Sequence, residues 1–218
     1  MSAEFVVIGL GTFGRNVALN LARAGQSVLA IDRDEKEVRA LSTELDSVVC
    51  VDSTEEAALR ELRVERMSCA VVAIGGESME GSILTTALLR QLGVPRIVAR
   101  AMTELHGRVL RSVGAHEVLR VEAEMGQRLA RRLAQPNILE WVDLGPQADL
   151  VEVEVPESWV ESTVSDLDVR RTHGFSILAI RRRGKVRAVL EGVEVLKSGD
   201  RILAIGPPEA IKKIGSLS

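Results

Sequence analysis

Three glycines near the N-terminus have the spacing of a phosphate-binding loop. They are Gly9, Gly11 and Gly14 in the run Gly9-Leu10-Gly11-Thr12-Phe13-Gly14. In such a loop the first glycine allows a tight turn, the second lets a pyrophosphate approach the backbone, and the third lets a helix pack on a strand. The N–H groups at the start of that helix then hold phosphate oxygens. This chemistry requires a strand before the loop and a helix after it.

An acidic residue stands where a ribose-binding carboxylate is expected. Asp32 lies 18 residues after Gly14 and follows the apolar run from Ser27 to Ile31. A carboxylate at this position accepts hydrogen bonds from both ribose hydroxyls and repels a 2′-phosphate. With the glycine loop it predicts an adenine nucleotide site. The alternative is a glycine turn followed by an aspartate that caps a helix.

Three further segments are expected at the same edge of the sheet. Asp52-Ser53-Thr54 follows the third strand, Ala73-Ile74-Gly75-Gly76 follows the fourth, and Arg100 ends the fifth, where its charge suits a terminal phosphate. The alternative for each is an ordinary helix cap, a loop or a surface ion pair. The candidate cofactor-binding residues are therefore Gly9, Gly11, Thr12, Phe13, Gly14, Asp32, Arg33, Asp52, Ser53, Thr54, Ala73, Ile74, Gly75, Glu77 and Arg100.

Strand and helix patterns alternate strictly up to residue 121, which is how these candidates would be positioned. Apolar runs predict strands over 4–9, 27–31, 47–51, 69–74, 96–100 and 117–121. Helical patterns predict helices over 14–25, 34–45, 54–62, 80–92 and 103–113. The expected fold class is α/β, with a doubly wound, parallel, Rossmann-like sheet. The carboxyl ends of its strands would gather the candidate residues.

The pattern changes after residue 121. A helix is expected over 122–133, followed by a loop-like stretch to Pro146. Alternation then predicts strands over 150–155, 175–182, 186–190 and 201–206, with helices over 164–172 and from Pro208 onward. The expected domains are a nucleotide-binding domain over 1–134, a linker over 135–149, and a small C-terminal α+β domain over 150–218.

The residues needed for hydride chemistry are scarce. The chain has no tyrosine, which excludes a tyrosine-dependent dehydrogenase mechanism, and its three histidines, His106, His116 and His173, are scattered. We therefore expect a binding protein rather than an enzyme. An NAD-dependent oxidoreductase is the alternative. A redox-sensing transcription factor would need a winged-helix domain, which the strand-rich C-terminal part does not offer.

The composition limits which kinds of partner and which cellular location are expected. The formal net charge is −3, from 28 basic and 31 acidic residues that are interspersed, which argues against a nucleic-acid partner. Cys50 and Cys69 lack metal-ligand spacing and are expected to be small buried residues. The apolar runs are strand-sized, too short for a membrane helix, and strand sequence begins almost at the N-terminus, which leaves no room for a signal peptide. A cytoplasmic location is therefore expected.

These residues together resemble a known family. Gly9 to Gly14, Asp32, Asp52-Ser53-Thr54, Val72 to Gly75, Leu84-Thr85-Thr86 and Gly114-Ala115 resemble the RCK N-terminal domain. Asp166 to Arg170, Gly174 to Ile180 and Gly199 to Leu203 resemble the RCK C-terminal domain. The likeness covers nearly the whole chain, and its single-copy arrangement is similar to the Trk/Ktr-type regulatory subunits of bacterial potassium uptake systems.

The resemblance implies a homo-oligomer, built from dimers into an octameric ring, on the inner face of the membrane beside an integral-membrane potassium channel subunit. It implies that the N-terminal domain binds an adenine nucleotide, ATP or ADP or else NAD or NADH, which changes the shape of the ring. It also implies that Glu122 helps bind a divalent cation, Mg²⁺ or Ca²⁺, and that Val164, Ser165 and Arg170 contribute to a cyclic di-AMP site. Thr12 departs from the arginine of ATP-responsive members and cannot supply the positive charge with which that arginine reads the terminal phosphate.

Overall fold

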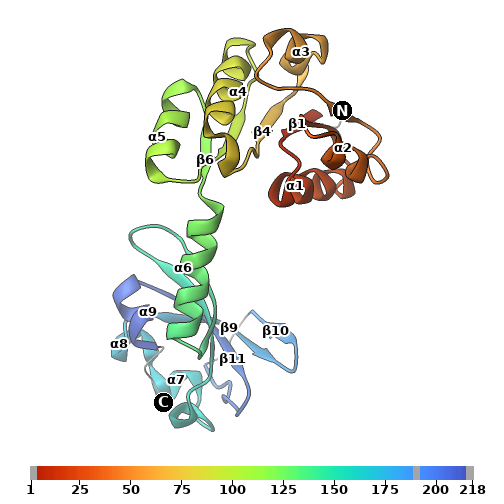
Figure 1. Cartoon of the computed structure of the whole chain (residues 1–218). Coiled ribbons are helices and arrows are strands. Elements are labelled where there is room, and N and C mark those ends of the chain that lie inside the picture. The colour runs from red at the N-terminus through yellow and green to blue at the C-terminus, as the bar shows by residue number, and fades with distance from the viewer. Residues whose placement is uncertain (1–3, 189–191, 215–218) are drawn as a thin grey trace. The chain divides into compact units, whose positions relative to one another are not determined.

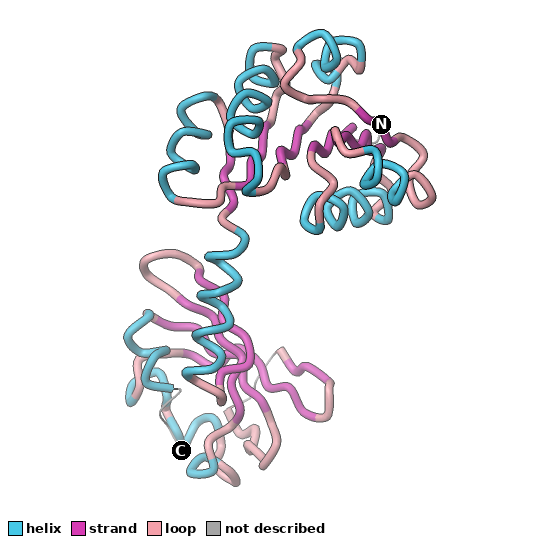
Figure 2. Tube along the Cα trace, viewed as in Figure 1, coloured by secondary structure: helices cyan, strands magenta, loops and turns pink. Residues whose placement is uncertain are grey.

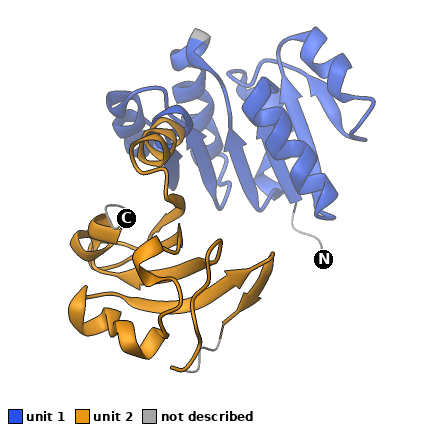
Figure 3. Cartoon of the chain, turned by 90° about the horizontal axis from the view of Figure 1, so that it is seen from below, with its two compact units in different colours: residues 1–124 blue, residues 125–218 orange. Residues whose placement is uncertain are grey.

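The computed structural model describes residues 4–188 and 192–214, without the side chain of Glu77. Figure 1 labels its elements and Figure 2 distinguishes helices from strands. The chain divides into two compact units, residues 1–124 and residues 125–218 (Figure 3).

A six-stranded parallel sheet organises the first unit. Its strands are β1 (Glu4–Ile8), β2 (Ser27–Asp32), β3 (Val48–Cys50), β4 (Cys69–Val72), β5 (Ile97–Arg100) and β6 (Glu117–Leu119). They lie in the order β3-β2-β1-β4-β5-β6, with every neighbouring pair parallel. The order reverses beside β1, which creates the crevice where such sheets bind ligands. The expected doubly wound α/β fold is confirmed.

Helices cover both faces of this sheet. They are α1 (Thr12–Arg23), α2 (Glu35–Leu41), α3 (Glu56–Glu61), α4 (Met79–Gln91) and α5 (Glu104–Val113), with the 3₁₀ turns η1 (Val64–Arg66) and η2 (Gly76–Ser78). Alternate residues of β1 serve the two faces: Val6 packs in a cluster with Leu59, Leu89 and Leu110 of α3, α4 and α5. Val7 packs instead with side chains of α1 and α2. Burial on both faces explains the continuous apolar strands.

Helix α6 (Val121–Ala134) leads from the first unit into the second. None of its residues is buried. Met125, Leu129 and Leu133 are four residues apart and are exposed by 56%, 46% and 71%. Residues at that spacing share one face of a helix, so α6 carries an apolar stripe along its length.

The second unit is built on an antiparallel sheet. Its strands are β7 (Ile138–Asp143), β8 (Asp149–Glu154), β9 (Ser176–Arg182), β10 (Lys185–Arg187) and β11 (Arg201–Gly206), in the order β10-β9-β11-β8-β7. The helices are η3 (Glu157–Trp159), α7 (Val164–Leu167), α8 (Val169–Thr172) and α9 (Pro208–Ile214). Trp159, Phe175 and Ile211 belong to one buried core.

Three expectations for this unit need correction. The stretch over 138–143 is strand β7 and not loop-like, because it pairs with β8. The helix expected over 164–172 is interrupted at Asp168, whose φ of 39° is left-handed and breaks the α-helical path into α7 and α8. Strand β10 ends at Arg187, and positions 189 and 190 of the expected strand lie outside the described residues. In the first unit, Cys50 is exposed rather than buried, whereas Cys69 is buried as expected.

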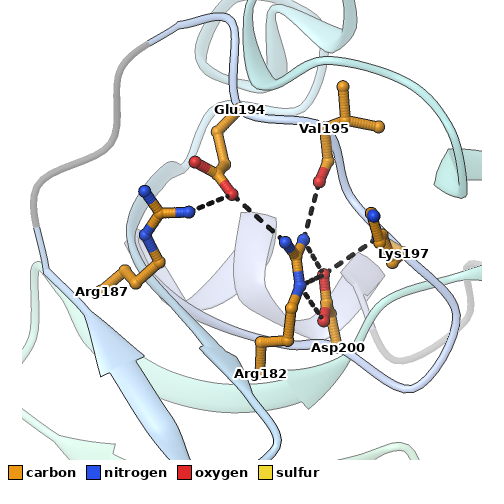
Figure 4. A network of polar contacts seen from close by, with 6 residues as sticks. All are labelled: Arg182, Arg187, Glu194, Val195, Lys197 and Asp200. Carbon is orange, nitrogen blue, oxygen red and sulfur yellow. Dashed lines mark hydrogen bonds and ion pairs between the residues drawn. The ribbon is translucent and has the colours of Figure 1, made fainter.

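An arginine–carboxylate network holds three segments of the second unit together (Figure 4). Arg182 of β9 donates from Nε and Nη2 to the carboxylate of Asp200, which is 2% exposed, and from Nη2 to the Val195 carbonyl at 2.8 Å. Glu194 accepts from Arg187 at 2.8 Å. The hydrogen bonds from Arg182 hold the pKa of Asp200 below its ordinary value.

We expect Asp200→Asn to destabilise the second unit by about 2 to 3 kcal/mol, because Arg182 loses the charge of a carboxylate that is 2% exposed and keeps only Glu194, at 3.4 Å, as a charged partner. Since folding lowers the pKa of Asp200, the pair stabilises the fold above the ordinary aspartate pKa and loses its effect as pH falls through the folded value. The difference between the two proteins should therefore be constant near neutral pH and shrink only below about pH 4.

Tryptophan fluorescence during urea unfolding measures this directly. Both tryptophans of the chain, Trp141 and Trp159, belong to the second unit. Arg171→Met is the matched control, because the Arg171 side chain is 85% exposed and pairs with Asp168 on the surface. We expect the control to change stability by less than about 0.5 kcal/mol. An Asp200→Asn protein as stable as wild type would contradict the interpretation.

Candidate nucleotide-binding site

A cavity of about 510 Å³ opens at the carboxyl ends of β1 to β5. Its walls come from these five strand ends and the segments that follow them, which is the expected edge of the sheet. Most of the candidate residues line it: Gly9, Gly11, Asp32, Arg33, Asp52, Ser53, Thr54, Ala73, Ile74, Gly75 and Arg100. The fold therefore brings together segments that are up to 91 residues apart, from Gly9 to Arg100.

The glycine loop is held tightly against the sheet. Gly9 has a φ of +93°, and its N–H donates to the Ile31 carbonyl at 2.8 Å. A β-carbon on Gly14 would lie 1.8 Å from the carbonyl oxygen of Gly9, so only glycine fits there. A β-carbon on Gly11 would meet nothing within 4 Å, and Gly11 lines the cavity. The space beside Gly11 suits a phosphate group at the N-terminus of α1.

Asp32 is tied to the glycine loop by hydrogen bonds. One carboxylate oxygen accepts from the Leu10 N–H at 2.5 Å, and the other accepts from the Asp34 N–H at 2.9 Å. A carboxylate has about four lone-pair sites, so two remain for ribose hydroxyls. Asp32 therefore combines two roles: it positions the loop and offers acceptors to the cavity.

The third strand end supplies a second carboxylate. Asp52 Oδ1 accepts from the N–H and the hydroxyl of Thr54, at 2.9 and 2.7 Å. These hydrogen bonds, the backbone one first, lower the pKa of Asp52. Ser53 is buried, and its hydroxyl lies 2.8 Å from that of Thr85 on α4. The Asp52-Ser53-Thr54 segment is thus fixed in place with its carboxylate ionised.

Arg100 supplies positive charge at the other side of the cavity. Its side chain is 17% exposed, its guanidinium carbon lies 5.8 Å from the centroid of the Phe13 ring, and it donates from Nη2 to Glu122. That hydrogen bond, after a backbone one, lowers the pKa of Glu122. Carboxylates at one side and a guanidinium at the other match the two ends of a nucleotide, the ribose and the phosphates.

Some candidates do not line the cavity. Thr12 lies on the surface at the start of α1, Phe13 lies beneath Arg100, and Gly14 packs against Gly9. The side chain of Glu77 lies outside the described residues. Sequence reasoning missed Asp34 and Glu37 at the start of α2 and Ser78 and Gly81 at the start of α4, which also line the cavity. A rule that counts the first helical turn after each strand would have found them.

The candidate residues for a cation and for cyclic di-AMP do not line this cavity. Glu122 lies in the first turn of α6, and among the described residues no group of three or more His, Cys, Asp or Glu side chains could hold a metal ion. Val164 is half-buried, whereas Ser165 and Arg170 are exposed on the short helices α7 and α8. The assignments of a cation to Glu122 and of cyclic di-AMP to these three residues stay predictions.

His106 has a structural role between α4 and α5. It is 4% exposed, and its Nδ1 accepts from the Met102 N–H at 3.3 Å. Its Nε2 therefore carries the proton and donates to the Ser82 hydroxyl at 2.8 Å, while Ser82 donates to the Met79 carbonyl. Burial lowers the pKa of His106. The residues that line the described cavity include no histidine.

We expect the first unit to lose stability as pH falls below about 6.5, the ordinary pKa of histidine. The unfolded chain protonates His106 first, because folding lowers its pKa, so stability is full above the unfolded value and declines toward the folded one. Urea unfolding followed by far-ultraviolet circular dichroism between pH 8 and 5 measures this. His106→Gln keeps a donor to Ser82 and should remove much of the dependence; an unchanged pH profile in that variant would assign the effect elsewhere.

Among the described residues, no helix is both long enough and apolar enough to cross a membrane.

Comparison with known proteins identifies the family. The family models of the TrkA-N domain and the TrkA-C domain match residues 5–121 and 150–217. The chain is 35% identical over 206 residues to Ktr system potassium uptake protein C of Bacillus subtilis (strain 168), covering 94% of this chain and 93% of that protein. It is 32% identical over 210 residues to Ktr system potassium uptake protein A of the same strain, covering 96% and 94%.

A solved structure shares the fold. The GsuK channel bound to NAD superposes with a TM-score of 0.67 at 16% identity, covering 100% of this chain and 39% of that chain. At this identity the likeness concerns the fold alone. The two domain matches and the full-length relatives show that the chain belongs to the family of TrkA-N and TrkA-C domain proteins that includes the Ktr system potassium uptake proteins.

Proposed function

We propose that this protein is a nucleotide-sensing regulatory subunit of a potassium uptake system, which binds an adenine nucleotide without altering it chemically. The observation that carries the proposal is the cavity of about 510 Å³, with the glycine loop, the Asp32 and Asp52 carboxylates, and Arg100 around it. A dinucleotide or a nucleoside di- or triphosphate offers binding partners to the glycine loop, to the two carboxylates and to Arg100.

Two observations support a binding role. The lining residues of the described cavity include no histidine, tyrosine or cysteine. Asp32 and Asp52 accept hydrogen bonds from backbone N–H groups, which favours their ionised forms and suits hydroxyl binding rather than proton transfer. The relatives are potassium uptake proteins, which supports a role in potassium transport.

The apolar stripe on α6 supports self-association. Met125, Leu129 and Leu133 form an exposed row that a second copy of the helix would cover. We propose that the protein forms dimers through this face, that dimers assemble into a ring, and that the ring acts at the inner face of the membrane on an integral-membrane channel subunit. A nucleotide drives gating only through its difference in affinity for two ring shapes.

Calorimetric titration of the full chain with ATP, ADP, AMP, NAD and NADH, paired with solution X-ray scattering, tests this function. We expect affinities to differ among the five ligands and the scattering profile to change with the tighter ones. Repeating the titration with Mg²⁺, Ca²⁺ and cyclic di-AMP tests the assignments to Glu122 and to Val164, Ser165 and Arg170. Equal affinities with identical profiles, or turnover of a nicotinamide substrate, would refute the proposal.

A further inference from the structure

A second cavity, of about 710 Å³, lies within the second unit. Its walls come from the last turn of α6, from the hairpin of β7 and β8, and from α9. Small-molecule sites typically have volumes of roughly 300 to 1,000 Å³, so this cavity is large enough for a ligand. The side chains that decide its chemistry are Arg131, Trp141, Asp143, Asp149, Pro208 and Lys212.

Asp149, the first residue of β8, places a carboxylate in a row of core side chains. It shares one face of the strand with the buried residues Val151 and Val153, and it is itself only 5% exposed. In the part of the chain that the structure describes, no group donates a hydrogen bond to this carboxylate or forms an ion pair with it. Burying a carboxylate without a partner is costly. Because Asp149 lines the cavity, a donor that enters the cavity can supply the partner.

A second carboxylate lines the same cavity from the neighbouring strand. Asp143, the last residue of β7, is the register partner of Asp149 in the antiparallel pair. Residues directly opposite each other have β-carbons about 5 Å apart, where like charges are destabilising. A cationic group between the two carboxylates would turn this repulsion into attraction. Among the described residues, no third Asp, Glu, His or Cys side chain joins them in a metal site, so an ammonium group is the better match.

The positive charges of the cavity come from the helices. Arg131 of α6 has its guanidinium carbon 5.5 Å from the centroid of the Trp141 ring, and it forms no ion pair with a carboxylate of the described residues. Lys212 of α9 is already paired with Glu209, at 3.1 Å. Arg131 is therefore the cation that can bind a carboxylate of a ligand, and the Trp141 ring positions its guanidinium.

We propose that this cavity binds an apolar α-amino acid in its zwitterionic form. The ammonium group donates to Asp143 and Asp149, and the carboxylate accepts from Arg131. The apolar side chain packs against Trp141 and Pro208. The lining carries both signs of charge, on different elements, which favours a zwitterion over a simple amine or a simple anion. The proposal concerns the second unit alone and does not depend on nucleotide binding.

Calorimetric titration of the full chain with amino acids and their blocked derivatives tests the two charged contacts. The ligands are L-leucine and L-phenylalanine, their amides, which lack the carboxylate, and their N-acetyl derivatives, which lack the ammonium group. We expect at least one of the two amino acids to bind, and to bind at least about tenfold more tightly than either of its derivatives, since each derivative loses one charge-assisted contact. No binding of either amino acid, or equal binding of a derivative, would overturn the proposal.

Two substitutions assign the contacts to residues. Asp149→Asn should weaken binding of the amino acid at least about tenfold. Arg131→Gln should weaken it by a similar factor and change binding of the amide less than about twofold, because the amide has no carboxylate to lose. Arg171→Gln is the matched control, since Arg171 is 85% exposed and does not line the cavity, and it should change neither affinity. Unchanged affinity in Asp149→Asn or in Arg131→Gln would refute the assignment.

Urea unfolding separates ligand binding from a structural role of Asp149. Without ligand, Asp149→Asn should unfold at the same or a higher urea concentration than wild type, because a neutral amide of the same shape replaces a buried carboxylate that has no partner. Saturating amino acid should raise the midpoint of wild type and leave that of the variant unchanged. A variant that unfolds at lower urea would mean that Asp149 stabilises the fold through a partner within the protein. Stabilisation of wild type by CaCl₂ or MgCl₂ as large as that by the amino acid would assign the two carboxylates to a metal ion. Either result would overturn the proposal.

Discussion

Gly14→Ala is expected to destabilise the first unit by about 2 kcal/mol or more. The added β-carbon would lie 1.8 Å from the Gly9 carbonyl oxygen and 3.0 Å from the Ala73 side chain, and the first of these is backbone that cannot rotate away. Alanine in a helix gains about 1 kcal/mol over glycine. Displacing backbone in a packed site costs more than about 3 kcal/mol, so the steric cost outweighs the helix propensity. Circular dichroism during urea unfolding measures the loss.

Gly11→Ala is the matched variant, and it should separate binding from folding. Gly11 has an extended backbone, with φ of −60°, and a β-carbon there would meet nothing within 4 Å. We expect the unliganded chain to lose only about 1 kcal/mol or less, because Gly11 is the N-cap of α1, where alanine is less favourable than glycine. Nucleotide affinity should fall more than about tenfold, because the methyl group occupies the space where phosphate approaches the backbone. A stable Gly14→Ala protein, or an unaffected affinity in Gly11→Ala, would contradict this account of the loop.

Asp32→Ala is expected to weaken nucleotide binding by about 10- to 100-fold, the equivalent of one or two charge-assisted hydrogen bonds. Part of this loss would be indirect, because the Asp32 carboxylate also accepts from the Leu10 N–H and holds the glycine loop. Affinity alone therefore does not show that Asp32 contacts the ribose. A ligand without ribose hydroxyls resolves the two contributions.

Titration with ATP and with 2′,3′-dideoxy-ATP provides that comparison. In wild type the dideoxy ligand should bind about tenfold or more weakly, because two acceptors of Asp32 lose their donors. In Asp32→Ala the two ligands should bind equally. Asp34→Ala is a useful control, since Asp34 also lines the cavity but caps α2 through the Lys36 N–H. If Asp32→Ala still discriminates between the ligands, the hydroxyls are read by another residue.

The sequence was sufficient for the first unit because local signals and the global fold agree there. Apolar runs predict strands that are buried on both faces, and strict alternation with helices permits few topologies. The carboxyl ends of parallel strands meet at one edge, so the positions of Asp32, Asp52, Gly75 and Arg100 in the chain already place them around one cavity. Eleven candidate residues line this cavity, and their role in binding a nucleotide stays a prediction.

Local signals were weaker in the second unit. Ile138–Asp143 is a strand because β8 offers it hydrogen-bond partners, and no periodicity within the segment requires that. Asp168 takes a left-handed conformation that divides a helix, although nothing in its neighbours' pattern indicates a break. In both places tertiary contacts outweigh local propensity.

What the sequence by itself determined was the fold class, the edge of the sheet where the candidate site lies and the residue types around it, because these follow from hydrophobic periodicity and from glycine and carboxylate chemistry at fixed spacings. Only the tertiary structure decided which polar side-chain atoms already have hydrogen-bond partners within the protein. It pairs Asp32 with the glycine loop, Arg182 with Asp200, and Arg100 with Glu122, with Arg100 Nε left over. Hydrogen-bond partners between distant residues depend on side-chain geometry in three dimensions, which spacing along the chain does not encode.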